Sequence, residues 1–129
     1  MRLLLDTHAL IWWSLGHPGL SSRARAAIAD DASEVFVSAA SVWEVAIKFA
    51  LGKFPEAGAF VASLKAGQAV PGMTPLPILA AHAVHAGLLA TSHKDPFDRM
   101  LIAQAQLENL LLVSNERLFD SLGVIRIWD

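Results

Sequence analysis

The chain has 129 residues, of which 54% are hydrophobic and 17% charged, and its formal net charge is −2. A chain of this length buries about two-thirds of its unfolded surface, so we expect one domain over residues 1–129. The near-neutral charge gives no sign of a nucleic-acid binder, and the absence of cysteine excludes disulfides and thiolate metal sites. The apolar excess favours an interface with a second subunit or a partner protein.

The first half of the chain alternates short apolar strands with helices. We expect a strand over 2–6, a helix from Thr7, a turn at 16–19, a helix over 21–32, a strand over 35–38, a helix over 39–52 and a helix from Pro55 to residue 66. The leucines of RLLLD indicate a buried strand, and Thr7 is expected to cap the helix that follows. The helix over 39–52 is closed by Gly52.

The second half continues the same alternation. We expect a weak strand over 73–78, helices over 77–89 and 95–109, and strands over 110–113 and 124–128. Pro75 and Pro77 place the weak strand at the edge of a sheet, because proline cannot donate to a strand ladder.

No segment predicts export or a membrane span. Asp6 interrupts the N-terminal apolar run too early for a signal peptide. The uncharged stretch over 66–93 is broken by three prolines and three histidines, so it cannot supply the roughly 20 apolar residues of a span. We therefore expect a soluble, cytoplasmic protein.

Short apolar strands that alternate with helices indicate a parallel sheet covered on both faces, so we expect a three-layer α/β/α sandwich. Ligands of such sheets bind beyond the carboxyl ends of the strands, near the point where the strand order reverses. Asp6 ends the first strand, and Ser114 and Glu116 follow the strand over 110–113. Asp98, at a helix start, and Glu44, two turns into a helix, could reach the same edge.

Each acid also has a local interpretation. Asp6 fits an N-cap as well as it fits a functional acid. Glu44 has Lys48 four residues later, the favoured order for a helix ion pair, and taken alone the ion pair is the better interpretation. Asp95 is a helix cap and Asp98 favours the helix dipole, so capping alone explains DPFDR.

Other polar residues point more weakly to function. Ser114 and Glu116 also fit a helix start, with Ser114 as its cap. His82 and His85 could ligate a metal, but on an apolar helix packing is the stronger interpretation. The four tryptophans are typical core or interface anchors.

Taken together, the acids favour a metal site. Three or four neighbouring carboxylates repel one another and raise their own pKa values, and a divalent cation relieves that repulsion. Magnesium and manganese prefer oxygen ligands, often one or two carboxylates with water and substrate phosphates.

Four stretches, RLLLDTHALIWW, SVWEVAIK, HKDPFDRMLIAQA and LLVSNERLFDSLGVIRIW, resemble the PIN-domain ribonucleases, and most closely the VapC-type toxins of bacterial toxin–antitoxin pairs. The resemblance runs the length of the chain, and DPFDRMLIAQA is its most specific part. It implies a PIN-like fold and four catalytic acids, Asp6, Glu44, Asp98 and Glu116, of which Asp6 and Asp98 bind metal. The chain departs at Glu116, where the family more often has Asp in a Thr-x-Asp pattern, and this puts the fourth acid and a second metal in doubt.

The resemblance implies hydrolysis of RNA phosphodiester bonds with Mg²⁺ or Mn²⁺. The hydroxyls of Thr7 and Ser114 would hydrogen-bond to metal-bound waters or to phosphate oxygens. Asp95 would cap the helix that carries Asp98 and so support the site without binding the metal. Four basic residues near the acids in sequence are expected to line the cleft, where Arg99 would contact substrate or support the site, and a solvated face is the alternative: Lys48, Lys94, Arg99 and Arg117. Family membership also implies a homodimer and a cognate antitoxin.

Three other functions compete with this one. A haloacid-dehalogenase-type hydrolase fails because only 14 residues follow Asn115, too few for its later motifs. A receiver-type phosphoacceptor fails because no acid pair accompanies Asp6. A PIN-fold interaction module that has lost catalysis remains the alternative, favoured only by the departure at Glu116.

Overall fold

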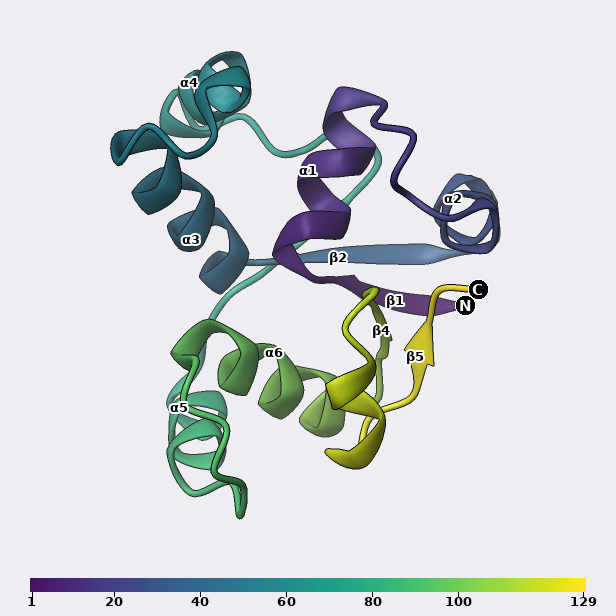
Figure 1. The fold of residues 1–129 in the computed structure, drawn as a ribbon, viewed down its shortest axis with the longest axis vertical. Helices are drawn as coiled ribbons and strands as arrows, with labels where there is room; N and C mark the ends of the chain where they lie inside the picture. Colours follow the sequence, from purple (N-terminus) through teal and green to yellow (C-terminus); the bar gives the residue numbers. More distant parts are fainter.

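The computed structural model describes residues 1–129 and contains a five-stranded, fully parallel sheet in the order β3-β2-β1-β4-β5 (Figure 1). Its strands are β1 (Arg2–Leu5), β2 (Glu34–Ser38), β3 (Thr74–Leu76), β4 (Leu111–Val113) and β5 (Arg126–Ile127). All five predicted strands form. Strand β3 lies at the edge of the sheet, as Pro75 within it and Pro77 just after it predict.

The helices also follow the predicted order. They are α1 (Thr7–Leu15), α2 (Ser22–Ala29), α3 (Ala39–Ala50), α4 (Gly58–Lys65), α5 (Ala80–Gly87) and α6 (Pro96–Leu107), with short 3-10 helices η1 (Pro55–Ala57) and η2 (Arg117–Ser121). The prediction that Thr7 caps α1 is wrong, because the Asp6 carboxylate accepts from the Ala9 amide and Thr7 is already helical. Ser114 does not cap a helix; its hydroxyl accepts from the Glu116 amide in a turn, and η2 begins one residue later.

The two faces of the sheet pack against different helices. In β1, Leu3 and Leu5 point to the face that α1 and α2 cover, whereas Leu4 points to the face covered by α6 (Figure 1). All three leucines are fully buried, and burial of each contributes about 1.5–3 kcal/mol. The predicted α/β/α sandwich is confirmed.

The remaining helices extend these layers. Helix α5 packs on α6, and α3 follows the carboxyl end of β2 and contacts both α1 and α6. Helix α3 therefore lies across the edge of the sheet where the strands end, between the helices of the two faces. None of the helices has the length and apolar run that a membrane crossing requires.

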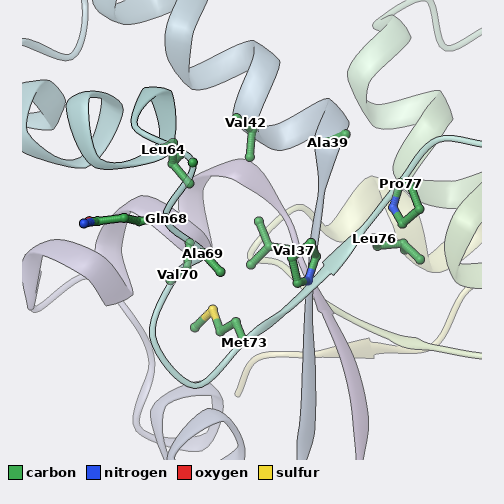
Figure 2. A pocket seen from close by; sticks show the side chains of 12 residues that line it. Val37, Ala39, Val42, Leu64, Gln68, Ala69, Val70, Met73, Leu76 and Pro77 are labelled. Atoms are coloured by element: carbon green, nitrogen blue, oxygen red, sulfur yellow. The ribbon is translucent and has the colours of Figure 1, made fainter.

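An apolar pocket of about 510 Å³ lies between β2, β3, α4 and the loop after α4 (Figure 2). Val37, Val42, Leu64 and Met73 are among its lining side chains, and none of the lining residues is charged. The predicted acids are therefore not part of this pocket, and the candidate site lies elsewhere, at the carboxyl edge of the sheet.

Candidate active site

Asp6 lies where the strand order reverses, because β2 and β3 lie on one side of β1 and β4 and β5 on the other. Its amide donates to the Val113 carbonyl at 3.0 Å, so Asp6 meets Ser114 across the ends of β1 and β4. Its Oδ1 accepts from the Ala9 amide at 2.8 Å, and the residue is 5% exposed. Asp6 therefore caps α1 and also lies at the carboxyl edge of the sheet.

Burial raises the pKa of Asp6 from 3.8 to about 6. The Ser114 hydroxyl and the Ala9 amide act in the opposite direction, and the negative charge of Asp98 raises the pKa further. Asp6 and Asp98 come from β1 and α6, far apart in the chain, yet each carboxylate lies within the electrostatic field of the other. A buried acid with such a pKa is a candidate functional group.

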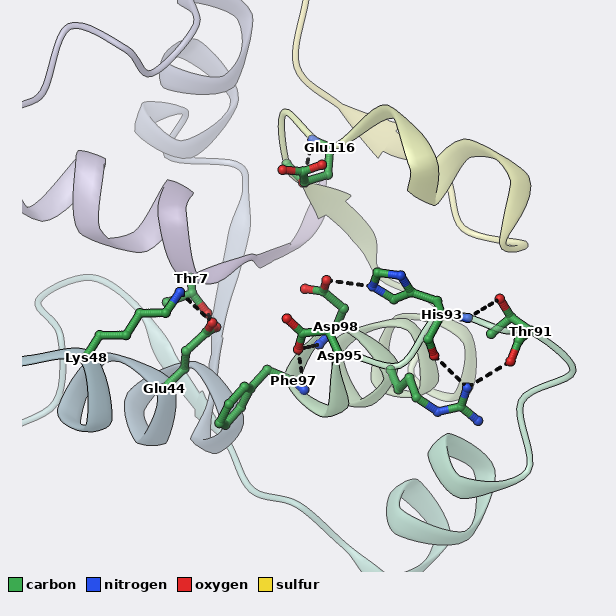
Figure 3. Close-up of polar contacts among 11 residues, drawn as sticks. Thr7, Glu44, Lys48, Thr91, His93, Asp95, Phe97, Asp98 and Glu116 are labelled. Atoms are coloured by element: carbon green, nitrogen blue, oxygen red, sulfur yellow. Dashed lines mark hydrogen bonds and ion pairs between the residues drawn. The ribbon is translucent and has the colours of Figure 1, made fainter. Parts of the chain in front are cut away.

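The start of α6 positions Asp98. The Asp95 carboxylate caps this helix by accepting from the amides of Phe97 and Asp98 at 2.9 and 3.1 Å, as predicted. Asp98 then stands in the first turn, with its Oδ2 2.8 Å from Nε2 of His93 (Figure 3). Burial raises the pKa of Asp98, the His93 hydrogen bond lowers it, and the charges of Asp95 and Glu44 raise it.

Glu44 on α3 is buried, and both of its oxygens have partners (Figure 3). The Thr7 hydroxyl donates to Oε1, and Lys48 Nζ lies 3.0 Å from Oε2. The helix ion pair expected between Glu44 and Lys48 is therefore present. Thr7 holds this carboxylate, and Glu44 still contributes negative charge near Asp98.

Glu116 follows β4 and is exposed, and Figure 3 shows it near the same edge as Glu44 and Asp98. Its backbone amide donates to the Ser114 hydroxyl at 3.0 Å, and Ser114 is fully buried. The four acids thus come from four elements and lie around one edge. No three of the chain's His, Asp and Glu side chains are close enough together to hold a metal ion by themselves.

Arg99, expected to support the site or contact substrate, is engaged within the protein. Its five guanidinium N–H donors are directed at backbone carbonyls, so none is left for a substrate. The acceptors are the carbonyls of Ala86, Gly87, Leu89, Thr91 and His93, at 3.0–3.2 Å. Lys48 is paired with Glu44, whereas Lys94 and Arg117 are exposed.

The contact of His93 with Asp98 has no signal in the sequence, because it depends on the path of the α5–α6 loop. His82 and His85, by contrast, do what the packing interpretation predicts. His82 Nδ1 accepts from the Leu79 amide and its Nε2 lies 2.8 Å from Glu108, while His85 pairs with Gln106 at 2.6 Å. Both histidines thus join α5 to α6.

Comparison with solved structures gives full-length likenesses. A chain of VapBC2 from Rickettsia felis, in a complex with a promoter DNA fragment, is 18% identical with a TM-score of 0.75, and the match covers 100% of both chains. Mycobacterium tuberculosis VapC20, described as a toxin that cleaves the sarcin–ricin loop, is 15% identical with a TM-score of 0.71, over 98% of this chain and 99% of that one. A chain of the DNA-bound VapBC from Salmonella typhimurium is 19% identical with a TM-score of 0.67, and the match covers 98% of this chain and 96% of that one.

At these identities the likeness concerns the fold. Comparison with curated proteins gives no match. The sequence itself matches the PIN domain over residues 3–125, which is nearly the whole chain and includes all four acids at the carboxyl edge. The chain therefore belongs to the PIN-domain family.

Proposed function

We propose that this protein is a Mg²⁺- or Mn²⁺-dependent endoribonuclease and the toxin of a toxin–antitoxin pair. The observation that carries the proposal is the small number of hydrogen-bond partners around the carboxylates of Asp6 and Asp98. Asp6 Oδ1 is held by the Ala9 amide and Asp98 Oδ2 by His93, and the Ser114 hydroxyl is a further neutral partner of the Asp6 carboxylate. No other amide or basic side chain bonds to either acid, so both carboxylates are anchored and can still bind a cation.

The donor set fits Mg²⁺ or Mn²⁺. Two carboxylates are a common protein contribution for Mg²⁺, which completes its coordination with water and substrate phosphates. The raised pKa values of Asp6 and Asp98 reflect burial and mutual repulsion, which a cation between them would relieve. Asp6 and Asp98 are therefore the residues that would hold the ion.

When bound there, such an ion polarises a phosphate oxygen and acidifies a water molecule for in-line attack. Asp6 and Asp98 would hold the ion. The hydrogen bond from the Ala9 amide to Asp6 and the Asp95 cap of α6 keep both acids in place. Glu44, held by Thr7 and Lys48, adds negative charge without a free oxygen.

Ser114 lies next to Asp6, and its buried hydroxyl supports the Asp6 carboxylate from within the protein. The RNA substrate is inferred from the family resemblance and from VapC20, which is described as cleaving the sarcin–ricin loop.

Exposed apolar side chains support protein partners. Trp43 and Ile47 on α3 and Leu51 just after it are spaced four residues apart and are 60%, 37% and 65% exposed, so they form a stripe. We assign this stripe to the antitoxin, since several solved relatives are toxin–antitoxin complexes. A second apolar surface, formed by Val84 and Leu88, is assigned to a second copy of the chain.

Cleavage of a mixed RNA pool that includes tRNA tests the proposal. Wild-type protein, Asp6→Asn and Asp31→Asn are compared in Mn²⁺ and in EDTA. Asp31→Asn is the matched control, since this exposed acid lies in the loop before β2, at the opposite edge of the sheet. We expect Mn²⁺-dependent cleavage by the wild type and the control, and none by Asp6→Asn. Folded wild-type protein that cuts nothing in Mn²⁺ would support the non-catalytic interaction module instead.

A further inference from the structure

Arg99 organises the loop that connects α5 to α6. It stands one residue after Asp98, and its guanidinium bonds to five carbonyls distributed over residues 86–93. Hydrogen bonds from a charged guanidinium are stronger than neutral ones, and a planar fork with five donors fixes direction as well as distance. The first turn of α6 therefore determines the path of this loop.

The last residue that Arg99 holds is His93. The His93 carbonyl accepts from Arg99 Nη1 at 3.0 Å, and the His93 amide donates to the Thr91 hydroxyl at 3.2 Å. Both backbone polar groups of His93 are thus occupied. Its imidazole then projects to Asp98, with a separation of 2.8 Å between Nε2 and Oδ2 (Figure 3).

We propose that His93 is a positioning residue that fixes the Asp98 carboxylate for binding of the divalent cation. This inference rests on the proposed function and adds a residue to it. The imidazole donates its Nε2 hydrogen to Oδ2, which fixes the rotation of the carboxylate and leaves Oδ1 for the cation.

The surroundings of Asp98 explain why it needs such a partner. The end torsion of an aspartate side chain has broad wells, so an unheld carboxylate rotates readily. Its charged neighbours, Asp95 and Glu44, repel it and cannot orient it. His93 is the one side chain that hydrogen-bonds to the Asp98 carboxylate. Partners of this kind, one step removed from a metal, change metal affinity by about 10–100-fold.

Two substitutions separate positioning from packing. His93→Phe keeps an aromatic ring but removes the donor. His93→Gln places an amide N–H near the position of Nε2 and restores the donor. Mn²⁺ binding is measured on each full-length variant by electron paramagnetic resonance of the free ion, with Asp98→Asn as the reference for loss of the site. Thermal unfolding and RNA cleavage are measured on the same samples.

We expect His93→Phe to weaken Mn²⁺ binding by about 10–100-fold and His93→Gln by about 3-fold or less, with similar unfolding temperatures. At saturating Mn²⁺ the KM for RNA should stay unchanged. Wild-type affinity in His93→Phe overturns the positioning role alone, because the wild type still binds Mn²⁺ and cleaves RNA. Equal loss in both variants with lower unfolding temperatures assigns His93 a structural role and also overturns it. Wild-type protein that neither binds Mn²⁺ nor cuts RNA overturns both the proposed function and this inference.

Discussion

The molecule contains two histidine–carboxylate pairs with the same separation of 2.8 Å and different surroundings. His82 and Glu108 join α5 to the end of α6, and His93 and Asp98 lie at the carboxyl edge of the sheet. His82 is 1% exposed and its second nitrogen accepts from the Leu79 amide, so this pair is complete within the packing between α5 and α6.

Around Asp98, by contrast, negative charge accumulates from Asp6, Asp95 and Glu44. A histidine–carboxylate hydrogen bond is therefore no sign of function by itself. What distinguishes the carboxyl edge is the surplus of partly buried carboxylates that the protein leaves without enough positive partners. That surplus is electrostatically unfavourable in the protein alone, and a bound cation would offset it.

The largest difference between the two pairs is expected in catalysis. Asp98→Asn should reduce metal-dependent RNA cleavage by about 100-fold or more, because it removes a ligand of the cation. Glu108→Gln should leave cleavage within about 2-fold, since Glu108 lies in the α5–α6 packing. Initial rates of cleavage at saturating Mn²⁺ measure both. Similar losses in the two variants would show that the pairs are not functionally distinct.

The stability of the folded protein should depend more on the His82–Glu108 pair than on the His93–Asp98 pair. His82→Ala removes a fully buried ring and leaves the Leu79 amide without its acceptor, so the free energy of unfolding should fall by about 3 kcal/mol. Urea denaturation measures this change, and Mn²⁺ affinity of the folded variant should equal that of the wild type. A His82→Ala protein with normal stability but weak Mn²⁺ binding would reverse the comparison.

The smallest expected effect tests the surplus charge itself. The pKa of Asp6 is about 6 in the folded protein, above its ordinary value of 3.8, so the folded state binds more protons between these values. Wild-type stability should therefore fall as the pH rises from about 4 to about 6. Asp6→Asn keeps the cap but cannot ionise, and it should raise the free energy of unfolding by about 1–3 kcal/mol at pH 7 without metal.

This gain from Asp6→Asn should fade below about pH 4, where the wild-type carboxyl is protonated in both states. Unfolding in EDTA over about pH 3–7 measures it. If Asp6→Asn instead lowered the free energy of unfolding at pH 7, the ionised Asp6 carboxylate would be stabilising in the folded protein.

Much of the fold could be predicted from local patterns. The leucines of β1, the prolines in and just after β3 and the DPFD cap of α6 each have one physical interpretation, and the structure agrees with all three. Thr7 failed as a cap because Asp6, one residue earlier, is the better acceptor for the Ala9 amide. The helix start considered at Ser114 also lies too early, because η2 begins at Arg117 and its five residues carry no helical periodicity that would fix its start.

The candidate site was only partly predictable. The placement of Asp6 and Asp98 at one edge follows from a parallel sheet, because all strand ends meet there. The roles of Arg99 and His93 could not be predicted from the sequence. The five carbonyls that Arg99 holds come from the last two residues of α5 and from the irregular loop after it, and local patterns do not predict the path of that loop. The charge of Arg99 and its position next to Asp98 in the sequence suggested a phosphate contact. In the structure its N–H groups donate to backbone carbonyls instead.

The sequence by itself determined the order of strands and helices, the caps and the residues that end each strand, since these depend on neighbours a few positions away. Only the tertiary structure decided which carboxylate oxygens remain available and which cations are already engaged. These depend on side chains that meet across the sheet edge from β1, α3, the α5–α6 loop and α6. Burial in that arrangement, rather than any local pattern, raises the pKa values of Asp6 and Asp98.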